Sequence, residues 1–235
     1  MIPLHDNNPT RRFPVVTRLL LGANILLWLY VLSLSRTPGA AEAFYDTYAF
    51  DWTAFSAALV GGHASLQLVV PLIVHMFLHG GWLHLIGNML YLWIFGDNVE
   101  DALGSAPFLL FYVLCGIVAA IGQGLLAAGP LVGASGAIAG VLGAYLIMYP
   151  TARVSTLVFL GIFITIIELH SIIVIGMFVV LQIIESVAEL RLSVHPAPQQ
   201  VAYFAHMFGF LAGMLLLPLM RRNSGGTRRL RAGWG

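Results

Sequence analysis

Long apolar runs separated by short polar stretches organise this chain. A helix that crosses the hydrocarbon core of a bilayer needs about 20 apolar residues, and several of these runs approach that length. The pattern therefore predicts an all-α membrane protein, a bundle of transmembrane helices without a second domain. The six predicted spans are Val15–Leu34, Trp82–Gly96, Pro107–Ala128, Ser135–Tyr149, Ile172–Ala188 and Val201–Met220, of which the second and the fourth are short.

The apolar stretch from 154 to 188 is the ambiguous part of this pattern, because Glu168-Leu169-His170 interrupts it. It fits either two spans or one span plus a segment at the interface. Arginine placement decides between them, since cytoplasmic loops are enriched in basic residues and a seventh span would move the arginine-rich C-terminus outside. We therefore expect Ile172–Ala188 to be the fifth span. Val154–Ile167 should be a return segment, shallow in the membrane on the cytoplasmic side or packed against protein.

This orientation divides the chain into three parts. Residues 1–14 form a cytoplasmic N-terminal segment, 15–220 the six-span membrane domain, and 221–235 a basic cytoplasmic tail. Residues 36–81 form a long outer loop whose aromatic side chains among polar residues predict partly helical, amphipathic structure at the interface. The arginines on the expected cytoplasmic side are Arg11, Arg12, Arg18, Arg153, Arg221, Arg222, Arg228, Arg229 and Arg231, and those outside are Arg36 and Arg191.

Composition supports the membrane interpretation. The chain of 235 residues is 59% hydrophobic and 9% charged, with a mean hydropathy of +0.90, whereas soluble domains carry roughly a quarter of charged residues. The net charge of +1 argues against a nucleic-acid partner. The single cysteine, Cys115, cannot form an internal disulfide.

Ser135 is the first candidate for chemistry. Gly133 and Gly136 flank it, and glycines allow a tight loop to enter a helix. The first helical turn offers unpaired N–H groups and the positive end of the helix dipole, so a serine here has oxyanion donors beside it. The simpler interpretation is packing, because Gly136-x-x-x-Gly140 is a common helix-association pattern, and this motif alone favours it.

His206 is the second candidate and lies at the start of the last span. Ionisable residues inside a membrane are costly to bury and are functional by default, although a hydrogen bond to a neighbouring helix is the simpler interpretation. Gly209-x-x-x-Gly213 follows and repeats the small-residue pattern, so the fourth and sixth spans can pack backbone to backbone. This predicts that Ser135 and His206 come within hydrogen-bond reach as a nucleophile and its general base. No aspartate is placed to join them, so the predicted unit is a dyad.

Polar residues also mark the start of the second span. His84 and Asn88 are four residues apart and therefore share one helix face. They fit a pair of oxyanion donors, and for Asn88 interhelical hydrogen bonding is the alternative. His75 and His79 have the spacing of metal ligands, but no carboxylate accompanies them. We expect these two to tie down the outer loop rather than to bind metal.

Three segments together resemble the rhomboid family of intramembrane serine proteases. The resemblance covers the chain from about His75 to Pro218 and places one segment on each of spans two, four and six. Each segment is moderately specific, and the three in this order are highly specific. They are His75-Met-Phe-Leu-His-Gly-Gly-Trp-Leu-His-Leu-Ile-Gly-Asn88, Gly133-Ala-Ser-Gly-Ala-Ile-Ala-Gly140 and Ala205-His-Met-Phe-Gly-Phe-Leu-Ala-Gly213.

The resemblance implies a six-span rhomboid-like bundle in which Ser135 is the nucleophile and His206 the base. It also implies an oxyanion hole made of His84, Asn88 and the Ser135 backbone N–H, and a water-filled cavity open to the outside. No cofactor and no metal are required. The expected partners are transmembrane-protein substrates and the lipid bilayer. The expected location is the bacterial inner membrane, with both termini cytoplasmic.

Two positions depart from the family pattern. The family often has a Trp-Arg pair in the first outer loop, where this chain has Val70-Pro71. Some members place an aromatic residue one turn after the serine, to stack on the histidine, and this chain has Ala139 there. We expect Phe204 or Phe208 to hold the imidazole instead.

Three functions are therefore weighed. The first is an intramembrane serine endopeptidase that hydrolyses peptide bonds in or near transmembrane segments with a Ser-His dyad. The second is a rhomboid-like pseudoprotease that binds membrane helices without cleavage. Such a protein usually lacks the serine or the histidine, and both are present here. The third is a small transporter or metal-binding protein that uses His75, His79, His84 and His206.

Overall fold

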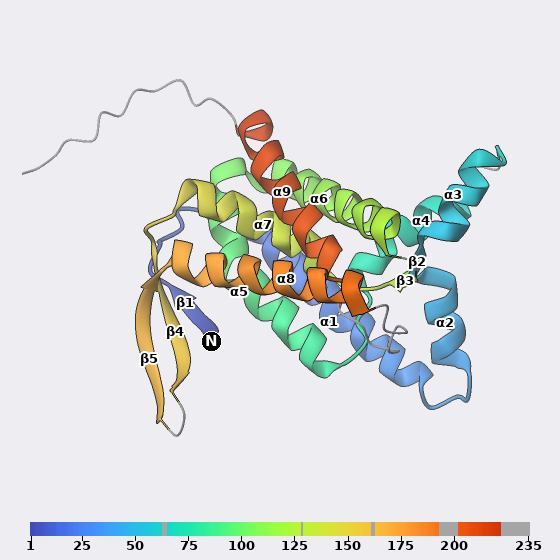
Figure 1. The fold of residues 1–235 in the computed structure, drawn as a ribbon, viewed down its shortest axis with the longest axis horizontal. Coiled ribbons are helices and arrows are strands. Elements are labelled where there is room, and N and C mark those ends of the chain that lie inside the picture. Colours follow the sequence, from blue (N-terminus) through green and yellow to red (C-terminus); the bar gives the residue numbers. More distant parts are fainter. Residues whose placement is uncertain (63–64, 128, 161–162, 193–201, 222–235) are drawn as a thin grey trace, which may run out of the picture.

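Helices dominate the computed structural model, which describes residues 1–62, 65–127, 129–160, 163–192 and 202–221. The long helices form a bundle, and from α5 onward successive helices run in alternating directions (Figure 1). The helical character of the all-α prediction is confirmed. The bundle helices are α1 (Val15–Leu34), α5 (Trp82–Leu103), α6 (Ser105–Leu126), α7 (Ser135–Met148), α8 (Ser171–Leu192) and α9 (Tyr203–Met220).

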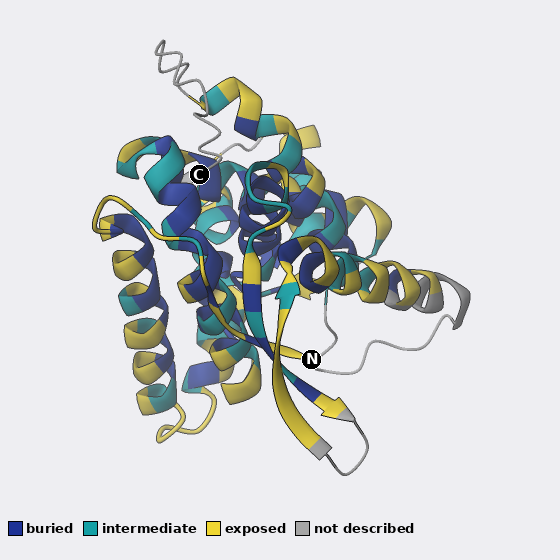
Figure 2. Ribbon diagram, turned by 90° about the vertical axis from the view of Figure 1, so that its left-hand side faces the viewer, coloured by how far each residue is buried: buried dark blue, intermediate teal, exposed yellow. Residues whose placement is uncertain are grey.

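The centre of the bundle is α7, whose residues from Gly136 to Tyr145 are all buried. Apolar and small residues occupy every side of this helix, and a helix that is apolar all round is a buried one. Figure 2 shows the buried segments at the centre of the bundle and exposed faces on the helices around them. Protein therefore covers the short helix α7, the fourth predicted span, on all sides.

The backbones of α7 and α9 lie in direct contact, as the two small-residue patterns predicted. A Cβ atom at Gly209 would lie 2.0 Å from the carbonyl oxygen of Gly136, and one at Gly213 would lie 1.9 Å from that of Gly140. Neither distance leaves room for a side chain. The packing interpretation of both motifs is thus confirmed, and the same contact fixes how the two helix starts face each other.

The segment between α1 and α5 is partly helical, as expected. The short strand β2 (Phe50–Asp51) pairs antiparallel with β3 (Pro130–Leu131) and so joins this segment to the loop that precedes α7. Aromatic rings pack along it, for example Phe44 against Tyr48 at 4.6 Å between ring centroids. Its helices are α2 (Ala40–Tyr48), α3 (Trp52–Val60), α4 (Leu66–Val74) and the 3-10 turn η1 (His75–Phe77).

The expected return segment is a β-hairpin, and this corrects the all-α prediction. β-branched residues fill both strands of the hairpin and favour extended structure. Val154, Thr156 and Val158 are buried on one face, whereas Ile164 and Ile166 are exposed. The antiparallel sheet has the order β1-β4-β5, with β1 at Ile2–Asp6, β4 at Arg153–Leu160 and β5 at Phe163–His170.

Three described helices, α1, α6 and α9, are long and apolar enough to cross a membrane. A fourth span results if Gln67–Phe77 and Trp82–Leu103, which are bent by 82° relative to each other, count as one broken span. Two shorter apolar helices, Ser135–Met148 and Ser171–Ile184, accompany them. The chain is therefore a multi-pass membrane protein.

The second predicted span was expected to end at Gly96, but helix α5 continues to Leu103. Acidic residues of this extension are stabilised by hydrogen bonds to the N-terminal part of the chain. The Glu100 carboxylate accepts the backbone N–H groups of Val16 at 2.9 Å and Thr17 at 2.7 Å. These are unpaired donors at the start of α1, where a carboxylate also meets the positive end of the helix dipole. Three parts of the predicted organisation lie outside the described residues: the end of the third span at Ala128, the start of the last span at Val201, and residues 222–235 of the predicted tail 221–235.

Candidate active site

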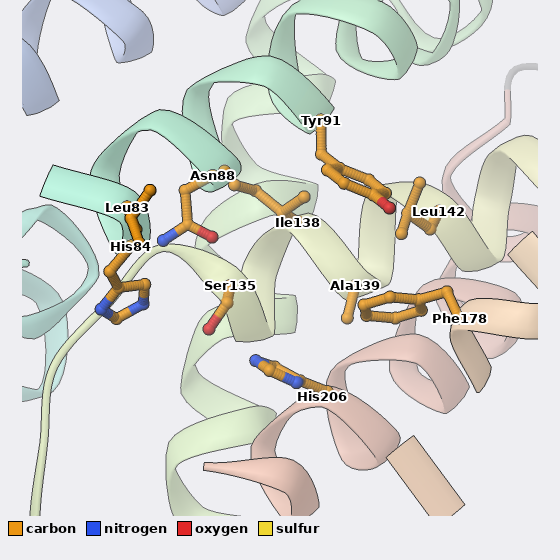
Figure 3. A pocket seen from close by; sticks show the side chains of 11 residues that line it. Leu83, His84, Asn88, Tyr91, Ser135, Ile138, Ala139, Leu142, Phe178 and His206 are labelled. Atoms are coloured by element: carbon orange, nitrogen blue, oxygen red, sulfur yellow. The ribbon is translucent and has the colours of Figure 1, made fainter. Parts of the chain in front are cut away.

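Three helices that run in the same direction, α5, α7 and α9, begin around one cavity of about 190 Å³ (Figures 1 and 3). Unpaired N–H groups and the positive ends of three helix dipoles therefore surround a shared space. The residues that line it are Leu83, His84, Gly87, Asn88 and Tyr91 from α5, Ser135, Ile138, Ala139 and Leu142 from α7, Phe178 from α8, and His206 from α9.

Ser135 and His206 face each other across this cavity. Ser135 is the first residue of α7, and Figure 3 shows its hydroxyl on the side where the His206 ring lies. His206 is only 6% exposed, and its Nε2 atom is buried without a hydrogen-bond partner among the described residues. Buried polar atoms are rarely left unpaired, so this nitrogen is poised for a partner that enters the cavity or for the hydroxyl beside it. The structure places both sequence-predicted candidates on this cavity, but no hydrogen bond joins Ser135 to His206, so the predicted hydrogen bond is not formed.

His84 and Asn88 line the same cavity from α5. The Asn88 amide nitrogen lies 3.0 Å from Nε2 of His79, and the His79 ring lies edge-to-face at 5.1 Å from the His84 ring. An amide has two N–H donors, so Asn88 can bind His79 with one and keep the other for the cavity. His79, for which we predicted only a role in the loop, is therefore a neighbour of both residues.

The loop before α7 passes close to His84. Gly133 has a φ of 127°, in the left-handed region that favours glycine. A Cβ atom there would lie 2.7 Å from both Cε1 and Nε2 of His84. The Gly133 N–H donates a hydrogen bond of 2.9 Å to the carbonyl of His75. This glycine therefore lets the loop run against the imidazole and deliver Ser135 to the start of its helix.

Helix α8 supplies the residues that hold His206. The Nδ1 atom of His206 lies 2.5 Å from Oε1 of Gln182, and the centroid of the His206 ring lies 5.9 Å from that of the Phe178 ring. The prediction that Phe204 or Phe208 would hold the imidazole is wrong, and Phe208 instead packs against α6 where Gly122 leaves space. Sequence reasoning missed Phe178 and Gln182, although their spacing of four residues placed them on one helix face.

A second glutamine, also missed, supports the start of α9. Gln123, in the last turn of α6, accepts the backbone N–H of Ala205 at 2.9 Å. This satisfies one of the unpaired donors at the start of the helix, directly before His206. A polar amide inside an apolar span was the signal that could have found it.

His75 and His79 each make a contact within the outer loop. Across the described residues, no group of three or more His, Cys, Asp or Glu side chains is placed to hold a metal ion. The helical turn that contains His75 ends at Phe77, so His75 and His79 do not share a helix face. His75 contacts the Pro71 carbonyl at 3.0 Å, and the Tyr45 hydroxyl donates to the His79 carbonyl at 2.5 Å. Both contacts secure the outer loop, as we predicted.

Comparison with known proteins decides the family. The family model of the rhomboid domain matches residues 66–223, which is more than half of the chain. The chain belongs to the rhomboid family. The resemblance inferred from the three sequence segments is confirmed, and the matched region of this rhomboid includes all the residues that line the cavity.

Known relatives carry the same family name. The chain is 34% identical over 142 residues to the putative rhomboid protease YdcA of Bacillus subtilis. The aligned region covers 59% of this chain and 64% of the relative. It is 42% identical over 80 residues to the rhomboid protease GluP of Bacillus subtilis, covering 34% of this chain and 15% of the relative. Rhomboid protein 1, mitochondrial, of Saccharomyces cerevisiae is 34% identical over 97 residues, covering 38% of this chain and 28% of the relative. The chain therefore spans less than two thirds of the length of each.

Proposed function

We propose that this rhomboid is a serine endopeptidase that hydrolyses peptide bonds in or near transmembrane segments of membrane proteins. The observation that carries the proposal is the shared cavity, in which the Ser135 hydroxyl faces His206 and the His206 Nε2 atom has no hydrogen-bond partner among the described residues. The relatives named as rhomboid proteases support the same chemistry.

In this mechanism Ser135 Oγ attacks the carbonyl carbon of the scissile peptide bond, and His206 Nε2 takes the hydroxyl proton. The tetrahedral intermediate collapses when His206 gives that proton to the leaving amine, which leaves an acyl ester on Ser135. A water molecule then attacks the ester, with His206 again as the base. The carboxylic acid leaves, and the proton returns to Ser135.

The negative charge that develops on the carbonyl oxygen needs donors. The side chains of His84 and Asn88 line the cavity opposite Ser135, and the Ser135 N–H is one of the unpaired donors at the start of α7. Each donor of this kind is typically worth roughly 3 kcal/mol of transition-state stabilisation. We assign His84, Asn88 and the Ser135 backbone to the oxyanion hole.

We further propose that α1 and α5 to α9 are six spans, with residues 1–14 and 221–235 on the cytoplasmic side of a bacterial inner membrane and 15–220 as the membrane domain. Arginine placement supports this orientation. The backbone N–H groups of Arg11 and Arg12 bind Asp101 near the end of α5, whereas the cavity lies where α5 begins. The cavity then opens toward the outer leaflet, where a transmembrane substrate can present its scissile bond.

Purified protein incubated with a panel of model transmembrane substrates tests this function. Ser135→Ala and His206→Ala should each abolish cleavage, because each removes one partner of the proton transfer, and both should retain the unfolding temperature of the wild type. Ser33→Ala, on α1 and outside the cavity, is the matched control and should cleave at the wild-type rate. Full activity of Ser135→Ala would refute the assignment.

A fluorophosphonate probe separates the protease from a pseudoprotease. The probe forms a covalent bond only with an activated serine, so the wild type should be labelled at Ser135 and the Ser135→Ala variant should not. A protein that binds transmembrane helices and leaves the probe unreacted would be a rhomboid-like pseudoprotease.

A further inference from the structure

The two ring nitrogens of His206 have different surroundings. Nδ1 lies 2.5 Å from Oε1 of Gln182, whereas Nε2 is buried without a partner among the described residues. A neutral imidazole carries one proton, and the hydrogen bond made by one nitrogen decides which tautomer is present. An amide oxygen can only accept, so this contact favours the tautomer with the proton on Nδ1 and the lone pair on Nε2.

The contact comes from one face of α8. Phe178, Gln182 and Ser186 follow one another at intervals of four residues and therefore lie along one side of the helix. The Phe178 ring lies 5.9 Å from the His206 ring, and the Ser186 hydroxyl lies 3.4 Å from the sulfur of Met207. The contact of this face with the start of α9 is centred on His206.

Among the described residues that line the cavity, no carboxylate competes with Gln182 for Nδ1. Besides His206, the titratable side chains among the described residues that line the cavity are His84 and Tyr91, both on α5, and none of the lining residues is a carboxylate. Ala139, one turn after Ser135, offers only a methyl group. The position that a buried aspartate takes in a serine-protease triad is therefore occupied by an uncharged amide from α8.

We propose that Gln182 is a positioning residue that holds His206 in the tautomer able to accept the Ser135 proton. This inference rests on the proposed function. When the Ser135 proton moves to Nε2, the ring carries a proton on each nitrogen, and the Nδ1 proton remains on Nδ1 and is donated to Gln182 Oε1. The amide takes no proton and stabilises the cation through the hydrogen bond alone.

Two substitutions at Gln182 test the role. Gln182→Met removes the acceptor at similar volume and should lower kcat about 10- to 100-fold with little change in KM, the range expected for the loss of a hydrogen bond to a charged group. Gln182→Glu keeps an acceptor, so its kcat should be much closer to that of the wild type than the kcat of Gln182→Met. The acid limb of its kcat–pH profile should move up by about one pH unit, because a carboxylate favours the protonated His206 ring. Ser186→Ala, one turn along the same face, is the control and should change kcat less than about twofold, since it leaves the ring contacts intact.

The tautomer can also be read in the wild type. Nitrogen-15 spectra of histidine-labelled protein should show a protonated Nδ1 and an unprotonated Nε2 for His206, whose signals are assigned by their loss in His206→Ala. A protonated Nε2 would overturn the proposal, as would wild-type kcat in Gln182→Met. If Gln182→Met does not fold, the wild-type spectrum and the pH profile of Gln182→Glu still test whether Gln182 sets the tautomer.

Ser135→Ala, measured alongside, separates this proposal from the one on which it rests. If Ser135→Ala still cleaves substrate, the proposed function itself has failed. If it is inactive while Gln182→Met retains full kcat, only the positioning role of Gln182 has failed.

Discussion

At the scale of single residues, Gly133 and Gly129 form a natural pair for comparison. Their φ angles are 127° and 128°, so both lie in the region that side chains rarely adopt. A Cβ atom at Gly133 would lie 2.7 Å from the His84 ring, whereas one at Gly129 would meet nothing within 4 Å. The two glycines share the backbone requirement, and only Gly133 also makes room for an imidazole.

Gly133→Ala should therefore lower the cleavage rate by about two orders of magnitude, the effect of losing one oxyanion donor, because the new methyl group displaces His84. Gly129→Ala carries the same backbone strain without the contact and should cleave within a few-fold of the wild type. Steady-state kinetics of both variants on one transmembrane substrate make the comparison. Equal losses in the two variants would show that backbone strain, and not the His84 contact, sets the rate.

At the scale of helices, the α7–α9 contact sets how Ser135 and His206, the proposed dyad, lie relative to each other. Gly136 directly follows Ser135, and Gly209 lies three residues after His206. These two glycines touch at the point where a Cβ atom on Gly209 would lie 2.0 Å from the Gly136 carbonyl oxygen. Backbone oxygen cannot move aside as the end of a flexible side chain can, so a larger residue must push the helices apart.

Gly209→Ala should accordingly destabilise the protein by about 1–3 kcal/mol, the usual cost of overpacking, and should lower kcat by separating Ser135 from His206. Gly22→Ala, on α1, meets nothing within 4 Å and should be neutral or slightly stabilising, since alanine is the better helix former. Thermal unfolding in detergent, together with cleavage assays, measures both effects. Similar unfolding temperatures for the two variants would contradict the packing argument.

The same scale shows what the sequence could predict and what it could not. The bounds of α1 and α7 were predicted well, because their apolar runs end where the helices end. The hairpin of β4 and β5 was missed because hydropathy scores isoleucine and valine alike in a strand and in a helix, and their branching was not weighed. Local motifs singled out Ser135 and His206, which both line the cavity. Gln182 was missed because it meets His206 only in three dimensions.

At the scale of the whole molecule, the N-terminal segment connects parts that are distant in sequence. β1 pairs with β4, and the Asn7 amide donates to the Glu168 carboxylate at 2.9 Å. Asp6 Oδ2 accepts from the Tyr145 hydroxyl at 2.5 Å and from the Asn98 amide at 3.2 Å. One carboxylate thus joins the sheet, α5 and α7 at the end of the bundle opposite the cavity.

This junction should make stability depend on pH. Burial raises the pKa of Asp6 from 3.8 to about 6, so the folded protein holds this proton more tightly than the unfolded chain does. The contribution of Asp6 is then most favourable below about pH 4 and is lost as the pH rises through about 6. Asp6→Asn keeps an oxygen for both donors without the charge, so its unfolding temperature should exceed that of the wild type above pH 6, and the gap should close toward pH 4. Glu42→Gln, at an exposed carboxylate of α2, should leave the profile unchanged. Parallel profiles for the wild type and Asp6→Asn would mean that another group carries the pH dependence.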